Sequence, residues 1–253
     1  MRKPPWVVEK ERARRASARE TLWLFGLHAV RDALVNPRRD KRRLVATRNA
    51  LDRLGGAVEG GPEPEIADPR RFPVPLDPGS VHQGAALEVR PLDWGALGDH
   101  LDGRPVVALD RVSDPHNVGA VLRSAEVFGA AAVLAPARHA APESGGLAKA
   151  ASGALERQPY LRVGNLGAAL RDLGAAGYAV LGLDGEGPET VEEALDAIRP
   201  RPVAIVLGAE GPGLREGTRA ACDRIARIDS VGAFGSLNVS NAAAVALYAA
   251  GRR

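Results

Sequence analysis

The sequence predicts an α/β protein whose main domain is built on a parallel sheet. Short runs of consecutive apolar residues, such as 105–109, 131–135 and 203–207, alternate with helical segments in the second half of the chain. Continuous apolar strands are typical of parallel sheets, because helices cover both faces of such a sheet. Aromatic residues form only 4% of the chain while glycine and alanine are abundant. This composition predicts helices packed closely on the sheet through small side chains.

The N-terminal part of the chain predicts a tail and a small α/β domain. Residues 1–20 are charged, contain Pro4 and Pro5 and show no hydrophobic period, so we expect a disordered basic tail. The small domain is expected over 21–90. Its expected elements are strands 22–25, 44–46 and 85–89, a helix over 28–35, and loops over the Gly- and Pro-rich segment 55–78.

A linker is expected over 91–104 and the main parallel-sheet domain over 105–253. Its expected strands are 105–109, 131–135, 159–163, 178–183, 203–207 and 224–228. Its expected helices are 118–128, 146–155, 166–173 and 190–198, followed by an Ala-rich helix after Asn241. Glu192 and Glu193 favour a helix start at Thr190, because acidic side chains stabilise the first turn of a helix.

The bulk composition excludes several classes of protein. No run of eighteen apolar residues occurs, so no membrane span is expected. The single cysteine, Cys222, predicts neither an internal disulfide nor a cysteine metal cluster, and the five histidines lack metal-ligand spacing. The N-terminus also lacks the apolar stretch of a signal peptide, so a cytoplasmic location is expected.

The charge distribution is uneven, although the net charge is only +3. Basic residues gather in the tail and again over 38–43, and the sequence pI is about 9.3. Such clusters attract polyanions by counterion release, which favours nucleic acid as a partner. The alternative is a solvated, solubilising tail.

The first candidate functional loop follows the expected strand 105–109. Asn117 lies beside the start of the next helix, and Arg123 lies about a turn and a half into it. Alternatively, Arg123 is a surface residue that pairs with Glu126. No Gly-x-Gly-x-x-Gly string follows this strand, which disfavours a dinucleotide-dependent oxidoreductase.

Three further observations point to a ligand-binding cleft. Segments 182–187 and 208–213 are glycine-rich and each follows an expected strand, and 232–241 combines glycine with Asn and Ser before the last helix. Ligands of open parallel sheets bind beyond the carboxyl ends of the strands. Glu210 lies beside Gly211, and a plain tight turn, which is the alternative, needs no carboxylate there. The loops together predict a cleft for a flat small molecule with polar edges.

Three motifs then occur in a defined order. They are Asn117 with Arg123, the segment 208–211 with Glu210, and Ile228 with the segment 236–240. In this order and near this spacing the chain resembles the SpoU-type ribose 2′-O-methyltransferases, a knotted class of S-adenosylmethionine-dependent RNA methyltransferases. The segment 25–30 resembles the start of the small RNA-binding domain found in that family, whose fold is related to certain ribosomal proteins.

The resemblance implies a C-terminal trefoil knot, S-adenosyl-L-methionine as cofactor and a homodimer with the active site at its interface. It implies the catalytic residues Arg123, Asn117, Glu210 and Asn238. It implies the cofactor-binding residues Leu183, Gly185, Leu207, Gly208, Gly211, Ile228, Leu237 and Asn238, and no metal. One departure is Asp229, which stands where the family usually has proline, and which is expected to affect the loop or the cofactor affinity.

The expected function is therefore methylation of a ribose 2′-oxygen in RNA, with a guanosine of 23S rRNA as the expected target. Two alternatives are a tRNA 2′-O-ribose methyltransferase and a catalytically silent RNA-binding factor for ribosome assembly. Intact Asn117, Arg123, Glu210 and Asn238 favour an enzyme over the silent factor.

Overall fold

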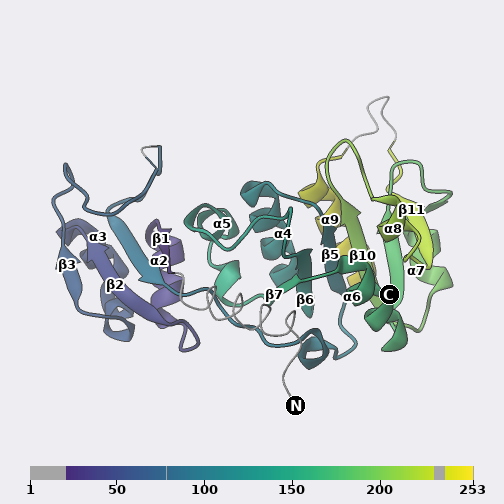
Figure 1. The fold of residues 1–253 in the computed structure, drawn as a ribbon, viewed down its shortest axis with the longest axis horizontal. Coiled ribbons are helices and arrows are strands. Elements are labelled where there is room, and N and C mark those ends of the chain that lie inside the picture. The colour runs from purple at the N-terminus through teal and green to yellow at the C-terminus, as the bar shows by residue number, and fades with distance from the viewer. Residues whose placement is uncertain (1–20, 78, 231–236, 253) are drawn as a thin grey trace, which may run out of the picture. The chain divides into compact units, whose positions relative to one another are not determined.

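The computed structural model describes residues 21–77, 79–230 and 237–252, and the expected tail 1–20 lies outside them (Figure 1). The chain divides into two compact units. We call Met1–Asp93 with Glu143–Lys149 the small unit, and Trp94–Pro142 with Ala150–Arg253 the large unit. The inclusion of 143–149 in the small unit was not predicted from the sequence.

The small unit contains a four-stranded sheet in the order β1-β4-β2-β3. Its strands are β1 (Leu22–Phe25), β2 (Lys41–Ala46), β3 (Pro64–Ile66) and β4 (Ala85–Val89). Its helices are α2 (Leu27–Val35), α3 (Arg48–Leu54) and the 3₁₀ helix η1 (Gly55–Gly60). The side chains of Leu24, Val30, Leu34, Leu44 and Leu87 are fully buried and form its core.

The expectation of loops throughout 55–78 is wrong at β3 and η1. β3 is a three-residue edge strand that begins with a proline, and proline is tolerated there because the first position of an edge strand can lack a backbone donor. α3 was also missed, although the Thr47 side chain caps it by accepting from the Ala50 backbone N–H at 3.2 Å.

The large unit contains a seven-stranded sheet in the order β7-β6-β5-β10-β8-β11-β9. All neighbouring strands run parallel, which confirms the predicted parallel sheet. The strands are β5 (Val106–Asp110), β6 (Ala132–Pro136), β7 (Tyr160–Val163), β8 (Ala179–Leu183), β9 (Glu189–Thr190), β10 (Val203–Gly208) and β11 (Arg224–Arg227). Of these, only the two-residue β9 was not predicted.

The helices of the large unit fall into two groups. They are α4 (Pro115–Val127), α6 (Leu166–Ala175), α7 (Val191–Ala197), α8 (Glu216–Arg219) and α9 (Val239–Gly251), with η2 (Leu97–His100) and η3 (Ala154–Glu156). The connections that contain α4 and α7 cross the sheet in one direction, and those that contain α6 and α8 cross it in the other. Because such crossovers are right-handed, α4 and α7 lie on one face of the sheet and α6 and α8 lie on the other. The contacts agree, since α9 packs against α4 and α7 while α6 packs against α8.

α5 (Gly145–Ala151) ends earlier than the expected helix over 146–155. The two residues that follow, Ser152 and Gly153, adopt positive φ angles of 51° and 92°. Left-handed residues end a helix, so the chain restarts as the short η3.

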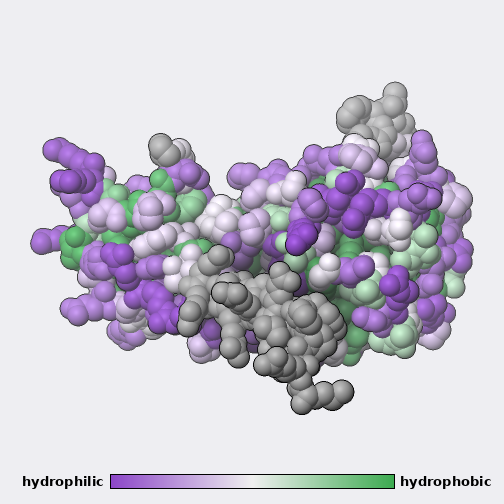
Figure 2. Space-filling model, in the orientation of Figure 1, coloured by the Kyte–Doolittle hydropathy of each residue, from purple (hydrophilic) through white to green (hydrophobic). Residues whose placement is uncertain are grey.

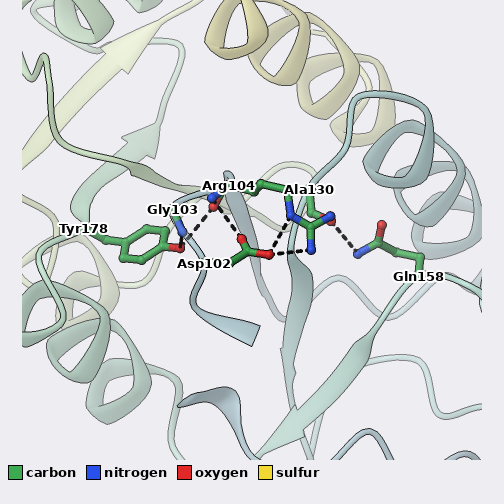
Figure 3. A network of polar contacts seen from close by, with 6 residues as sticks. All are labelled: Asp102, Gly103, Arg104, Ala130, Gln158 and Tyr178. Atoms are coloured by element: carbon green, nitrogen blue, oxygen red, sulfur yellow. Dashed lines mark hydrogen bonds and ion pairs between the residues drawn. The ribbon is translucent and has the colours of Figure 1, made fainter. Parts of the chain in front are cut away.

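A polar network fixes the start of the large unit (Figure 3). The Tyr178 hydroxyl accepts from the Gly103 backbone N–H at 3.0 Å and donates to the Arg104 carbonyl oxygen at 3.2 Å. Asp102 accepts from the Arg104 guanidinium at 2.7 Å. The segment that leads into β5 is therefore held beside the start of β8.

Candidate functional site

The candidate site is a cluster of three polar side chains from three separate segments. The Asn117 amide Nδ2 donates to Glu210 Oε1 at 3.0 Å. The Asn238 amide Nδ2 donates to the same Glu210 oxygen at 2.6 Å and to Asn117 Oδ1 at 3.0 Å. We call these three residues the polar cluster. The structure therefore brings together three of the four predicted catalytic residues.

The sheet topology explains why these segments meet. β5 and β10 are neighbours, with Asp110 opposite Gly208, but the helices that follow them lie on opposite faces. This arrangement defines a topological switch point, where open parallel sheets bind ligands. Asn117 follows β5 and Glu210 follows β10, so both side chains lie at this point.

Local structure fixes the orientation of the two asparagines. Asn238 is the N-cap of α9, and its Oδ1 accepts from the Ser240 backbone N–H at 2.9 Å and the Ser240 hydroxyl at 2.6 Å. Its Nδ2 is thereby directed to the two acceptors of the polar cluster. Asn117 lies in the first turn of α4, which begins with the N-cap Asp114 and Pro115.

The loop that carries Glu210 is tightly closed. A Cβ added at Gly208 would lie 2.2 Å from the backbone carbon of Gly213, so only glycine fits there. Gly211 and Gly213 adopt positive φ angles of 82° and 65°. The backbone N–H of Gly213 donates to the Ala209 carbonyl oxygen at 3.0 Å, which closes the loop.

An ion pair with a buried carboxylate, beside this loop, was not predicted from the sequence. Asp110, the last residue of β5, is fully buried, and its carboxylate accepts from the Arg215 backbone N–H at 3.0 Å and Nε at 2.7 Å. We call this pair the Asp110–Arg215 clamp. It ties the end of the Glu210 loop to β5. A carboxylate at the end of an otherwise apolar strand was the available indication.

Arg123 is not part of the polar cluster. It lies six residues after Asn117 on α4, which places it about 120° around the helix and roughly 9 Å along its axis. Arg123 is exposed and forms no hydrogen bond or ion pair within the described residues. The alternative pairing with Glu126 is also absent there, because Glu126 pairs with Arg157.

Most of the predicted cofactor-binding residues lie at the ends of three adjacent strands or just beyond them, whereas Leu237 and Asn238 directly precede α9. Leu183 ends β8 and pairs in register with Leu207 of β10 and Ala226 of β11. Ile228 lies two residues beyond Ala226 and is half-buried. The remaining predicted contacts are Gly185, Gly208, Gly211, Leu237 and Asn238. Residues 231–236, which carry part of the third motif including Ser236, lie outside the described residues.

The surroundings of this edge are apolar rather than reactive. Leu183 and Leu207 are buried, and a Cβ added at Gly182 would meet the Cys222 sulfur at 2.9 Å. Burial raises the pKa of the Cys222 thiol to about 12, so the thiol is protonated at neutral pH. Asp229 accepts from Arg227 Nε at 2.8 Å, so its charge is used in an exposed ion pair.

The basic segment 38–43 is largely engaged in structural contacts. Arg39 is buried and pairs with Glu143, and Lys41 donates to the carbonyl oxygens of Leu34 and Gly60. Arg42 and Arg43 pair with Asp40 and Glu65. These four basic side chains therefore all have partners within the small unit.

The small unit has a cavity of about 490 Å³ that is lined by one arginine, Arg48, and followed along the chain by Arg70 and Arg71. Its lining residues are Thr47, Arg48, Asn49, Ile66, Ala67, Asp68 and Pro69. The side chains of Arg48, Arg70 and Arg71 are exposed and form no ion pair within the described residues. Ile66 is 57% exposed beside them. Apolar and cationic groups thus lie together here.

Two further absences concern the described residues. No group of three or more His, Cys, Asp or Glu side chains could hold a metal ion there. None of the helices there combines the length and apolar character that a membrane span requires.

The fold and the polar cluster define an α/β protein whose parallel sheet has a topological switch point, the place where ligands of such sheets usually bind. Comparison with known proteins identifies the family. Residues 104–248 match the model of the SpoU rRNA Methylase family. The chain belongs to this family, which confirms the resemblance inferred from its motifs.

Curated relatives agree with the family assignment. The chain is 44% identical over 177 residues to 23S rRNA (guanosine-2′-O-)-methyltransferase RlmB of Burkholderia sp, covering 68% of this chain and 70% of that protein. It is 34% identical over 248 residues to the RlmB of Vibrio vulnificus, covering 91% of this chain and 96% of that protein.

A solved structure has the same fold. The SpoU methyltransferase AviRb of Streptomyces viridochromogenes, in complex with AdoMet, matches with a TM-score of 0.76 at 24% identity, covering 92% of this chain and 89% of that one.

Proposed function

We propose that this protein transfers a methyl group from S-adenosyl-L-methionine to the ribose 2′-oxygen of a guanosine in 23S rRNA. The relatives that cover over nine-tenths of the chain carry this activity in their names. The observation that carries the proposal is the polar cluster at the switch point, where Asn117, Glu210 and Asn238 meet. A ribosomal RNA substrate also supports a cytoplasmic location.

The residues at the strand ends fit an adenosyl ligand. Gly185 and Gly211 have no atom within 4 Å of an added Cβ, so a ligand can approach their backbones closely. The half-buried Ile228 supplies apolar surface at the same edge, backed by the buried Leu183 and Leu207. S-adenosyl-L-methionine held here would supply a methyl group on a cationic sulfonium for transfer to a ribose oxygen.

The polar cluster acts by positioning. Glu210 holds its loop to Asn117 and Asn238, so the three segments that surround the reacting atoms keep one geometry. Orientation of this kind contributes up to ~7–11 kcal/mol in favourable reactions.

Arg123 acts as a cation in this proposal. An arginine guanidinium stays protonated at neutral pH, so Arg123 clamps the phosphate of the target nucleotide and stabilises the forming alkoxide. The ribose proton leaves to that phosphate or to water. Arg123 lies about 120° around α4 from Asn117, so it points away from the polar cluster of its own chain. In a dimer, Arg123 of one copy would complete the site formed by the polar cluster of the other.

A homodimer is therefore part of the proposal. Val127, Val245 and Tyr248 expose 76%, 40% and 51% of their surface on α4 and α9, and Tyr248 meets Phe128 edge to face. An exposed apolar patch on two helices that pack together supports burial against a second copy.

The trefoil knot is also proposed. β10 lies between β5 and β8, β11 lies on the far side of β8, and α9 then returns to pack on β10 and α4. This return path supports threading of the C-terminal segment through the preceding loops.

The small unit is proposed to bind RNA. Figure 2 shows many strongly hydrophilic residues on its visible face. Arg48, Arg70 and Arg71, without ion-pair partners in the described part of the chain, supply charge for phosphates. The exposed Ile66 beside them supplies apolar surface for an unstacked base.

The test is methyl transfer by purified protein to unmodified rRNA, with the product mapped by nuclease digestion and mass spectrometry. We expect one 2′-O-methylguanosine in 23S rRNA, and Arg123→Ala should abolish transfer while calorimetric cofactor binding stays within about twofold of wild type. Arg171→Ala, an exposed arginine of α6, is the matched control. Methylation of tRNA alone would support the alternative substrate. The absence of both binding and transfer would leave the silent RNA-binding factor.

A further inference from the structure

Arg111 has an unusual backbone for an arginine. It directly follows β5 and adopts a φ angle of 61°, in the left-handed region that disfavours residues with a Cβ. Glycine would relax this position. Strain of this kind collects at ligand-binding sites, where the surrounding structure maintains it. The retained side chain therefore points to a use for its guanidinium.

The Arg111 guanidinium has no partner within the described residues. Its Nε is buried and unbonded, as are those of Arg90 and Arg162. Arg90, however, pairs with Asp40 at 3.4 Å, and Arg162 donates to the Ala141 carbonyl oxygen at 2.6 Å. Among the three, Arg111 alone forms neither a hydrogen bond nor an ion pair in the described part of the chain.

The carboxylates nearest to Arg111 along the two central strands are already engaged. Asp110 is held by Arg215 through both carboxylate oxygens. Glu210 accepts from both asparagines of the polar cluster. Because Asp110 pairs with Gly208, the segments that carry Arg111 and Glu210 leave two neighbouring strands at the same edge of the sheet. An uncompensated cation thus lies at the edge of the proposed active site.

We propose that Arg111 binds a phosphate of the RNA strand beside the target ribose. This rests on the proposed function and adds a residue to its substrate-binding surface. A guanidinium forms bidentate hydrogen bonds with phosphate, and RNA presents a phosphate on either side of every ribose. Arg111 is distinct from Arg123, because it extends from the β5 loop rather than from the middle of α4.

The test compares Arg111→Gly and Arg111→Gln with Arg171→Gln as the matched control. An unmodified 23S rRNA transcript is the probe, and filter binding is measured over a series of KCl concentrations. We expect the Kd for RNA to rise about tenfold in both Arg111 variants. The slope of log K against log salt should fall by about 0.7, the loss of one phosphate contact on single-stranded RNA. Cofactor Kd should stay within twofold.

Arg111→Gly separates binding from folding. Because glycine relaxes the φ angle, its Tm should equal or exceed that of wild type. Unchanged RNA affinity and salt slope in this variant would overturn the proposal, as would equal losses in Arg171→Gln. RNA binding is measured without turnover, so a wild-type protein that lacks methyl transfer would instead contradict the proposed function.

Discussion

Replacement of Asp110 by asparagine tests how far the Asp110–Arg215 clamp determines the site. Asparagine keeps the shape of the side chain and one acceptor oxygen. It removes the negative charge and turns an amide N–H₂ toward the Arg215 guanidinium, so donors face donors. The variant therefore breaks the ion pair without creating a cavity.

The size of the effect depends on burial. The Asp110 side chain is 0% exposed and the Arg215 side chain is 44% exposed. Breaking a fully buried ion pair costs about 3–5 kcal/mol, because a charge is left without a partner. Because water reaches the Arg215 guanidinium, the stability lost by Asp110→Asn should be smaller, close to the cost of one unsatisfied buried hydrogen bond, about 2 kcal/mol. For a chain of this size we expect Tm to fall by about 4–8 °C.

The assay is thermal unfolding of Asp110→Asn beside a matched control, Asp102→Asn. Asp102 and Arg104 also approach to 2.7 Å, but their side chains are 48% and 56% exposed (Figure 3). An exposed ion pair contributes at most about 1 kcal/mol, so the control should lose less than half as much stability. Hydrogen exchange should also quicken over residues 208–215 in Asp110→Asn alone.

Two results would refute the reasoning. Equal shifts in Tm for the two variants would mean that burial does not distinguish these pairs. A stable Asp110→Asn variant with unchanged exchange over 208–215 would mean that the clamp does not hold the Glu210 loop.

Three other variants or reagents test the site. Gly208→Ala should raise the cofactor Kd, measured by calorimetry, at least about tenfold, because the added Cβ would lie 2.2 Å from backbone atoms. The control Gly217→Ala, where an added Cβ has no atom within 4 Å, should leave the Kd unchanged, and equal affinities of the two variants would contradict this reasoning. Asn238→Asp places a second carboxylate at the 2.6 Å contact with Glu210, so single-turnover methyl transfer should slow about 100-fold, and a wild-type rate would exclude the positioning role. Iodoacetamide at pH 8 should alkylate Cys222 at least about 100-fold faster in guanidinium chloride than in the native protein, because burial raises the pKa of the native Cys222 thiol to about 12. Similar alkylation rates in the two conditions, measured by mass spectrometry, would disprove this.

The sequence predicted most of the parallel sheet because its signal is local. The runs 203–207 and 178–183 are continuously apolar, and they coincide within one residue with β10 and β8. Short or marginal elements were missed for the same reason. β9 has two residues and β3 has three, so neither is long enough to show a period.

The site was predicted in its parts but not in its connections. Asn117, Glu210 and Asn238 were selected by loop composition and by motif resemblance, and they form one hydrogen-bonded cluster. The clamp beneath them depends on a pairing between Asp110 and Arg215, 105 positions apart, which no local pattern encodes. The direction of Arg123 likewise follows from the orientation of α4, which packs against α9. The domain boundaries and the role of Arg123 stay predictions.

The polar cluster has a consequence for when the protein becomes active during its synthesis. Its hydrogen bonds join residues separated by 93 and 121 positions, and Asn238 is the last of the three along the chain. A ribosome must therefore translate past Asn238 before the cluster can assemble, and contacts between such distant residues form slowly. A nascent chain that stalls before Asn238 contains Asn117 and Glu210 but lacks the third residue of the polar cluster. Such a chain should therefore be inert toward RNA that it meets beside the ribosome.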